Sequence, residues 1–241
     1  MVIPLELVAK RNEQYRWLRL AKERPLVGIA KRLEMRLRKT LPSFVKRLWR
    51  LAKASASTQP LSQSIPGHLI TECRFLPSRQ EMLSAIPRDG VVAEIGTNRG
   101  DFARLIMERS VPRELHLVDI DFGSFNNSFR DDPRVKLHCG LSHEVISSFP
   151  DESFDWIYLD ADHSYDATLR DARYCIPKLK EKGLLIFNDF AHVDPFLGRY
   201  GVHRAVVQFS IENQWPFHYF VFQRAALYDV ALIKLSRGVG A

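Results

Sequence analysis

The sequence lacks several features that would assign the protein to a class at once. No apolar run approaches the roughly 20 residues needed to span a bilayer, and charges interrupt the N-terminal region too often for a signal peptide. The three cysteines, Cys73, Cys139 and Cys175, are widely spaced and form no CxxC pair. Their odd number and isolation argue against a disulfide framework and a zinc site. There is no internal repeat, and we expect a globular protein of a reducing compartment, by default the cytoplasm.

The positive charge is confined to one end of the chain. The net charge is +7, but residues 1–53 hold 15 Lys and Arg against 4 Asp and Glu, a net of +11. The remaining residues hold 20 basic and 24 acidic side chains, a net of −4. The basic character therefore belongs to the N-terminal segment, and the rest of the chain shows no footprint for nucleic acid.

The basic segment predicts an amphipathic helical extension over residues 1–53. Apolar residues recur every three or four positions from Leu26 to Leu51, with Lys and Arg between them. The small, polar, Pro-containing stretch 54–67 predicts a linker, and residues 68–241 a separate domain. The extension could lie peripherally on an anionic membrane, pack in a homodimer or bind nucleic acid, the last being disfavoured. Alternatively, its basic face is simply solvated and its leucines cover the core or a dimer partner.

The C-terminal domain alternates between strand and helix patterns. Seven strands are predicted, at 91–95, 115–119, 135–139, 154–159, 184–188, 218–223 and 229–235. Helices are predicted between them, at 101–110, 142–149, 164–180 and 201–213. Apolar strands that alternate with helices favour a parallel sheet covered on both faces. We therefore expect a doubly wound, mostly parallel, Rossmann-like α/β sheet of seven strands, closed by a hairpin that adds an antiparallel strand.

The first candidate binding motif is AEIGTNRGDFARL at 93–105, where a strand, a glycine turn and a helix follow one another. Ligands of such sheets bind beyond the carboxyl ends of the strands, and Gly96 and Gly100 allow close approach of the backbone. The spacing is GxxxG, so the motif is neither a dinucleotide fingerprint nor a P-loop. Glu94 would repel a pyrophosphate and suits a cationic ligand. The alternative is an ordinary strand–helix turn.

Asp119 ends the next predicted strand, in LHLVDID at 115–121. A carboxylate at this place can accept hydrogen bonds from ribose hydroxyls, as in dinucleotide folds. Asp121 is the alternative ligand.

These residues, EIGTNRGDF followed by LVDID, resemble the cofactor half of the class I S-adenosylmethionine-dependent methyltransferases. The resemblance implies that S-adenosylmethionine binds at Glu94, Gly96, Asn98, Gly100 and Asp119. The stretch VKLHCGLSHEVISSF resembles the next cofactor segment of that family, which places Gly140 and Ser142 beside the adenine.

Two further stretches, YLDADHSYDATLRDA and GLLIFNDF, resemble the metal-dependent small-molecule O-methyltransferases of the catechol, caffeoyl-CoA and macrocin types. The resemblance covers roughly residues 79–235. It implies that Asp160, which also adjoins the cofactor, and Asp189 bind Mg2+ or a similar ion, with Asn188 as the third ligand. Oxygen ligands at the ends of neighbouring strands suit such a hard cation. Asn188 departs from the more acidic form of the motif and removes one charge.

The catalytic base has two candidates, His163 and Asp162, which follow the predicted strand at 154–159. His163 could act as the general base, since imidazole side chains commonly transfer protons near neutral pH, and Asp162 is a rival base or a fourth ligand. Alternatively, Asp162 and Ser164 cap the following helix and His163 is a hydrogen-bonded loop residue. The resemblance thus implies metal-assisted methyl transfer to a small-molecule hydroxyl acceptor. The alternative function is a non-catalytic protein that binds the cofactor and uses the extension to bind membrane or nucleic acid.

Overall fold

The structure is a computed structural model, and it describes residues 61–125, 129–194, 198–224 and 227–235, together with Pro42 and Val45. The predicted extension at 1–53 lies outside these residues apart from Pro42 and Val45. Of the predicted linker, residues 61–66 are described and contain neither helix nor strand. Among the described residues, no helix is both long and apolar enough to cross a membrane.

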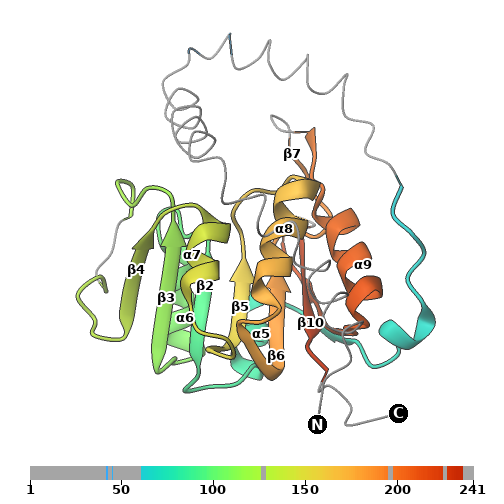
Figure 1. Cartoon of the computed structure of the whole chain (residues 1–241), viewed down its shortest axis with the longest axis horizontal. Coiled ribbons are helices and arrows are strands. Elements are labelled where there is room, and N and C mark those ends of the chain that lie inside the picture. Colours follow the sequence, from blue (N-terminus) through green and yellow to red (C-terminus); the bar gives the residue numbers. More distant parts are fainter. Residues whose placement is uncertain are drawn as a thin grey trace, which may run out of the picture. The chain divides into compact units, whose positions relative to one another are not determined.

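The described domain is a three-layer α/β structure (Figure 1). It begins with a 3-10 helix, Gly67–Leu69. The α-helices are α5 (Arg79–Ala85), α6 (Asp101–Arg109), α7 (Ser142–Ser148), α8 (Tyr165–Cys175) and α9 (Val202–Asn213). The strands of the main sheet are β1 (Arg74–Leu76), β2 (Val91–Ile95), β3 (Glu114–Asp119), β4 (Val135–Cys139), β5 (Phe154–Leu159), β6 (Leu179–Phe187), β9 (Phe217–Phe222) and β10 (Tyr228–Ile233). A short separate hairpin pairs β7 (Val193–Asp194) with β8 (Gly198–Arg199).

The eight strands of the main sheet follow the order β1-β9-β10-β6-β5-β2-β3-β4. All pairs are parallel except those of β10, which is antiparallel to both β6 and β9. The order reverses between β2 and β5, which is the position where doubly wound sheets bind ligands. The predicted mostly parallel sheet with one antiparallel closing strand is confirmed.

Three predicted details are wrong. The sheet has eight strands instead of seven, because β1, only three residues long, adds to the outer edge of β9. Helix α8 ends at Cys175 instead of residue 180, and β6 begins at Leu179 instead of residue 184. The charged residues 180–182 and Gly183 resemble a loop in sequence, yet they continue the strand, with a register shift against β5.

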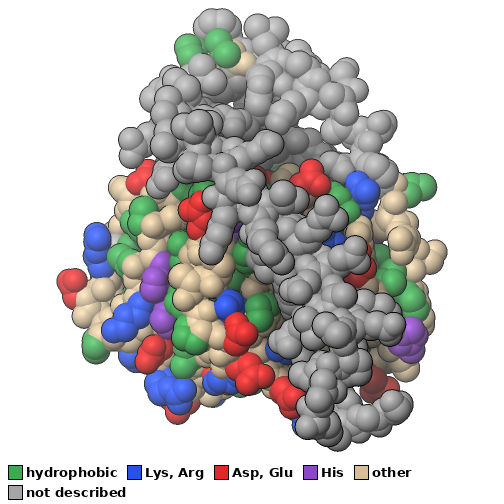
Figure 2. Space-filling model, viewed as in Figure 1, with side chains coloured by type: hydrophobic (Ala, Val, Ile, Leu, Met, Phe, Trp, Pro, Cys, Tyr) green, Lys and Arg blue, Asp and Glu red, His purple; other side chains and the backbone are tan. Residues whose placement is uncertain are grey.

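The core lies on both faces of the sheet because neighbouring side chains along each central strand point to opposite sides. On one face, Trp156 and Tyr158 of β5 pack in a cluster with buried side chains of α5 and α6, among them Met82 and Ile106. On the other face lie α7, α8 and α9, in front of the sheet in Figure 1. On the surface shown in Figure 2, the acidic and basic side chains of the described residues are intermixed.

Candidate cofactor and substrate site

The turn between β2 and α6 requires glycine at two positions. Gly96 and Gly100 have φ values of +95° and +82°, in the left-handed region that glycine enters without steric cost. A Cβ on Gly96 would lie 2.2 Å from the carbonyl oxygen of Asp160, and one on Gly100 would lie 2.3 Å from the ring of Phe125. Asn98 also has a positive φ, of 50°. The predicted glycine motif therefore forms a tight turn that lies directly against the end of β5.

Apart from a hydrogen bond between the side chains of Glu94 and Thr97, two buried polar atoms beside this turn have no partner within the described part of the chain. They are Oε2 of Glu94 and Oγ1 of Thr97, whose residues are 1% and 4% exposed. Burial raises the pKa of the Glu94 carboxyl well above its usual range, and the negative charge of Asp160 raises it further. Unsatisfied buried acceptors cost free energy unless a partner arrives. A ligand with a positive charge and hydrogen-bond donors would supply that partner.

Asp119 lies at the carboxyl end of β3, as predicted, and helps to shape the glycine turn. Its Oδ2 accepts a hydrogen bond of 2.7 Å from the backbone N–H of Asn98, and its Oδ1 accepts one of 3.1 Å from that of Asp121. Each carboxylate oxygen can accept more than one hydrogen bond. Asp119 is thus fixed at the ligand-binding edge with acceptor capacity left for ribose hydroxyls, whereas Asp121 Oδ1 accepts from the N–H of Gly123 at 2.9 Å.

Gly140 and Ser142 follow β4 at the same edge of the sheet. The N–H of Gly140 donates to the carbonyl oxygen of Asp119 at 2.9 Å, which joins the two loops. The hydroxyl of Ser142 donates to Oδ2 of Asp171 at 2.5 Å. Asp171 belongs to α8, is buried, and has its pKa raised by that burial. Ser142 therefore ties the loop after β4 to α8, and its predicted contact with adenine stays a prediction.

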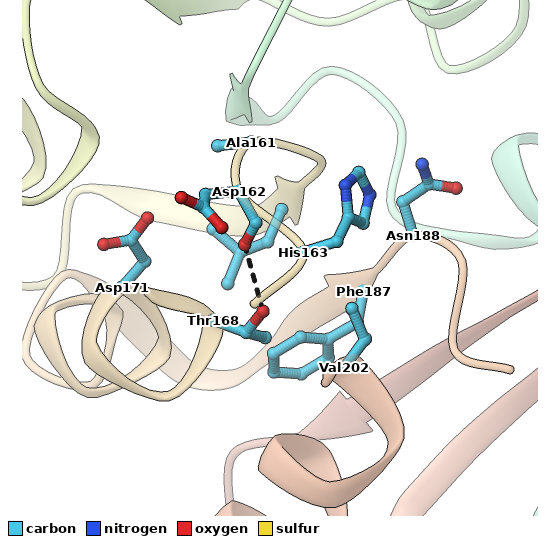
Figure 3. A pocket seen from close by; sticks show the side chains of 9 residues that line it. Ala161, Asp162, His163, Thr168, Asp171, Phe187, Asn188 and Val202 are labelled. Atoms are coloured by element: carbon cyan, nitrogen blue, oxygen red, sulfur yellow. Dashed lines mark hydrogen bonds between the residues drawn. The ribbon is translucent and has the colours of Figure 1, made fainter. Parts of the chain in front are cut away.

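The loop after β5 carries His163 and Asp162, and the two side chains point in different directions (Figure 3). Nε2 of His163 lies 3.2 Å from Oδ1 of Asp160 and 4.0 Å from Oδ2 of Asp189, and makes no hydrogen bond within the described residues. The imidazole stacks on Tyr200, with ring centroids 4.3 Å apart. The carbonyl oxygen of His163 accepts from the N–H of Gly201 at 2.8 Å. The start of α9 therefore holds His163 beside Asp160.

Asp162 is engaged mainly at the start of α8. Its Oδ1 accepts a hydrogen bond of 2.9 Å from the N–H of Ser164, and its carbonyl oxygen accepts one of 3.2 Å from the hydroxyl of Thr168. Figure 3 shows its carboxylate on the side of the loop toward Asp171, away from Asn188. Asp162 thus forms a turn before α8, and its partner Ser164, the N-cap residue, makes no side-chain capping hydrogen bond, so the predicted cap by these two side chains is not formed. Of the two predicted bases, only His163 faces the ends of β5 and β6.

A partly buried cation lies where the metal ion was predicted. Arg79, the first residue of α5, donates from Nε to Oδ2 of Asp229 at 2.7 Å and from Nη2 to Oδ1 of Asp229 at 3.1 Å. Nη2 also donates to Oδ1 of Asn188 and lies 3.8 Å from Oδ1 of Asp189. The hydroxyl of Tyr158 donates to Oδ2 of Asp229 at 2.9 Å. One guanidinium thus joins the beginning of β10 to the end of β6.

The three predicted metal ligands do not fit a divalent cation. No group of three or more His, Cys, Asp or Glu side chains suited to a metal occurs among the residues that the structure describes. The amide oxygen of Asn188 accepts from Arg79, and its Nδ2 donates to Oδ1 of Asp160 at 2.5 Å. The amide nitrogen of Asn188 therefore faces Asp160, and an amide nitrogen cannot bind a metal ion there.

The charge of Arg79 opposes a metal as well. Its Nη2 lies 3.8 Å from Oδ1 of Asp189. A divalent ion bound to that oxygen at about 2.1 Å would lie within about 6 Å of the guanidinium, and their repulsion would be roughly 5 kcal/mol at an effective dielectric constant of about 20. The expectation of bound Mg2+ at Asp160, Asn188 and Asp189 is therefore not supported.

Comparisons with known proteins found similarity both for the sequence and for the fold. Residues 93–190, less than half of the 241-residue chain, match a family model described as a methyltransferase domain. The structure also resembles an S-adenosylmethionine-dependent methyltransferase from Methanosarcina mazei, with a TM-score of 0.50 and 12% identity over 67% of this chain and 100% of that one. The described domain has the methyltransferase fold. The part of the fold that the family model matches includes the glycine turn, Asp119, Asp160 and Asp189.

Two other solved structures share this fold and carry different descriptions. The pyocyanin biosynthetic protein PhzM matches with a TM-score of 0.51 and 14% identity over 61% of this chain and 51% of that one. A protein from Clostridium thermocellum described as an rRNA methylase matches with a TM-score of 0.52 and 10% identity over 66% of this chain and 94% of that one. At these identities the likeness shows the fold alone. The alignments span 43% to 58% of the first three structures found, and no curated protein matches the chain.

Several functional residues were missed in the sequence. Thr97, Tyr158 and Tyr200 have no signal beyond their places next to predicted strand ends. Arg79 and Asp229 are single charged residues, and Asp229 lies at the start of a predicted strand. Because 150 positions separate them, only the fold reveals that they form a pair.

Proposed function

We propose that this protein transfers a methyl group from S-adenosylmethionine to the hydroxyl of a small molecule, without a divalent metal, and that His163 is the general base. The observation that carries the cofactor assignment is the pair of buried oxygens, Glu94 Oε2 and Thr97 Oγ1, which have no partner beyond each other's side chains and lie beside the glycine turn of a methyltransferase domain. S-adenosylmethionine combines an ammonium group, a sulfonium and ribose hydroxyls, and so matches this acidic edge.

The cofactor would be held by residues from three neighbouring loops. Glu94, Gly96 and Gly100 would bind its methionine half. The two glycines have no side chain to block the approach of the ligand, and the carboxylate of Glu94 needs a cationic partner. Asp119 would accept hydrogen bonds from the ribose, and Gly140 would allow close approach of the adenine. When bound, the cofactor supplies an electrophilic methyl group.

His163 is suited to remove the proton of the acceptor hydroxyl. If Nε2 carries the proton that faces Asp160, the other ring nitrogen is the base, and Asp160 stabilises the imidazolium that results. The stacking on Tyr200 holds the ring in place. Placing two bound substrates in line accounts for most of the catalysis in such a reaction, up to about 7–11 kcal/mol in good cases.

Calorimetry of the full chain with S-adenosylhomocysteine tests the cofactor assignment. We expect binding by the wild type, weaker binding by Glu94→Gln, and unchanged binding by Glu108→Gln, an exposed residue of α6. Wild type that fails to bind would refute the proposal. Release of S-adenosylhomocysteine in the presence of phenols or sugar hydroxyls tests the transfer step. Binding without turnover on every acceptor class would favour the non-catalytic alternative.

A further inference from the structure

The position of Arg79 is fixed from several sides. Its partner Asp229 is fully buried, with 0% of its surface exposed, and also accepts hydrogen bonds from Tyr158 at 2.9 Å and from Gln223 at 2.6 Å. The guanidinium lies over the rings of Phe102 and Tyr158, at 5.3 and 6.0 Å from their centroids. Only 23% of the Arg79 side chain is exposed. A planar guanidinium that is hydrogen-bonded along its edge and covered on its face has little freedom to leave.

From this anchor a chain of contacts leads to the proposed base. Arg79 donates to Oδ1 of Asn188, which fixes the orientation of the amide because only its oxygen can accept. The hydroxyl of Tyr158, whose proton is donated to Asp229, lies 3.3 Å from the same oxygen. The amide nitrogen then donates to Oδ1 of Asp160, and the same oxygen lies 3.2 Å from Nε2 of His163. Asn188 is 6% exposed, so this orientation is not set by solvent.

The backbone agrees with a fixed arrangement at the end of β6. Asp189 has a φ of 51°, a left-handed conformation that costs free energy for a residue with a side chain. Its N–H donates to Oδ1 of Asp229 at 3.3 Å. Asp229 thus binds both the guanidinium and the strained residue that follows Asn188.

We infer that Arg79 is the resident cation of this site: it takes the place of a divalent metal among Asp160, Asn188 and Asp189, and it positions Asn188 and Asp160 for His163. The catalytic consequence rests on the proposed function, whereas the exclusion of metal does not. Arg79 touches no substrate in this proposal and acts through Asn188 and Asp160, so it is a positioning residue.

The metal half is tested by titrating the full wild-type chain with Mn2+ and measuring free Mn2+ by electron paramagnetic resonance. We expect that neither the wild type nor Asp189→Asn binds Mn2+ stoichiometrically. We also expect the affinity of the wild type for S-adenosylhomocysteine to be equal with Mg2+ and with a chelator. One Mn2+ per chain, lost in Asp189→Asn, would overturn the inference. Because this titration needs no cofactor, it stands even if the proposed function fails, which would instead appear as absent S-adenosylhomocysteine binding.

The positioning half is tested with Arg79→Met and, because that change leaves Asp229 unpaired, with Arg79→Lys, which keeps the charge. The matched control is Arg173→Met, since Arg173 forms an exposed ion pair with Glu212. We expect the imidazole resonance of His163, assigned through His163→Gln, to move in both Arg79 variants and not in the control. We also expect turnover to fall at least tenfold with unchanged S-adenosylhomocysteine affinity. An unmoved resonance in a folded Arg79 variant would refute the positioning role.

Discussion

The guanidinium of Arg79 and the carboxylate of Asp229 form two hydrogen bonds, of 2.7 and 3.1 Å, across 150 positions of the sequence. The pair connects the first turn of α5 with the beginning of β10 and closes the acidic edge of the sheet around Asn188. Its effect on stability can be measured separately from its effect on chemistry.

Removing one partner of this pair should destabilise the domain strongly. Asp229→Ala removes the carboxylate that pairs with Arg79 through two hydrogen bonds and that accepts from the hydroxyl of Tyr158, and breaking a buried pair typically costs about 3–5 kcal/mol. Glu212→Ala is the control, because it removes an exposed ion pair with Arg173 that is worth about 1 kcal/mol or less. Urea unfolding of the two variants gives the comparison. A loss for Asp229→Ala no larger than that of the control would show that the pair adds no net stability.

The cofactor affinity should depend on Asp119. Asp119→Ala removes the charged acceptor of the ribose hydroxyls, and each lost hydrogen bond costs about 1.5–3 kcal/mol. It also removes the acceptor for the N–H groups of Asn98 and Asp121, which adds to the loss. Calorimetry with S-adenosylhomocysteine measures the effect, with Asp121→Ala as the control. Equal affinities of wild type and Asp119→Ala would exclude Asp119 from the site.

Turnover should depend on His163 more than on its neighbours. His163→Gln is expected to lower kcat by about 10²–10⁴-fold, the usual contribution of a general base, while S-adenosylhomocysteine binds unchanged. His192→Gln is the control, because His192 packs edge-on against the same Tyr200. The comparison requires steady-state kinetics with an accepted substrate. Similar rates for wild type and His163→Gln would leave His163 as a structural loop residue.

The stability should fall on acidification because of a pair of histidines on β3 and β4. Nδ1 of His116 lies 3.0 Å from Nε2 of His138. Burial lowers the pKa of both histidines. For His116, Glu114 raises the pKa in part and Lys136 lowers it further. For His138, the neighbouring His116 lowers the pKa further. Below the ordinary histidine pKa of about 6.5, the unfolded chain therefore binds more protons than the folded chain. The stability that the neutral pair provides is present above that pH and is lost as the pH falls toward the lowered values.

Urea unfolding at about pH 7.5 and about pH 5.5 measures this loss. The double variant His116→Gln/His138→Gln should lose less stability between the two conditions than the wild type. His218→Gln measures a separate contribution of the same sign, since burial and Arg74 also lower the pKa of His218. An unchanged pH dependence in the double variant would assign the acid sensitivity to other groups.

The predicted extension can be tested by truncation. A chain that begins at residue 61 should fold and bind S-adenosylhomocysteine, because every candidate cofactor residue lies after it. Sedimentation with anionic vesicles should be lost with residues 1–53 if their net charge of +11 makes the contact. Gel filtration of both chains measures any dimer. Aggregation of the truncated chain would mean that the leucines of the extension cover apolar surface of the domain.

The central strands and the first ligand loop could be predicted because local sequence determines them. The strands around the switch point are apolar runs, and the turn at Gly96 and Gly100 needs glycine for steric reasons that leave a local signature. Ser78 accepts a hydrogen bond from the N–H of Glu81 at 3.2 Å, as its capping spacing predicts. The edge strand β1 could not be predicted, because its three residues become a strand only by pairing with β9.

The predicted metal site is not supported, for a reason that lies in tertiary packing. The chain carries the right residue types at the ends of β5 and β6, and sequence reasoning placed them together correctly. Whether Asn188 offers oxygen or nitrogen to Asp160 depends on Arg79 and Tyr158, and the packing that brings them there is tertiary. A set of potential metal ligands predicts a bound metal ion only if no cationic side chain of the protein occupies their site.

The reversed direction of β10 has a consequence for how this protein can diversify. In the parallel part of the sheet, each strand delivers its last residues to the ligand edge, whereas β10 delivers its first. The connection from Phe222 of β9 to Tyr228 of β10 therefore begins and ends at that edge, within a few residues of Asp229. Insertions or substitutions there would reshape the acceptor side without touching the cofactor loops. Directed evolution toward a new acceptor should begin with this connection.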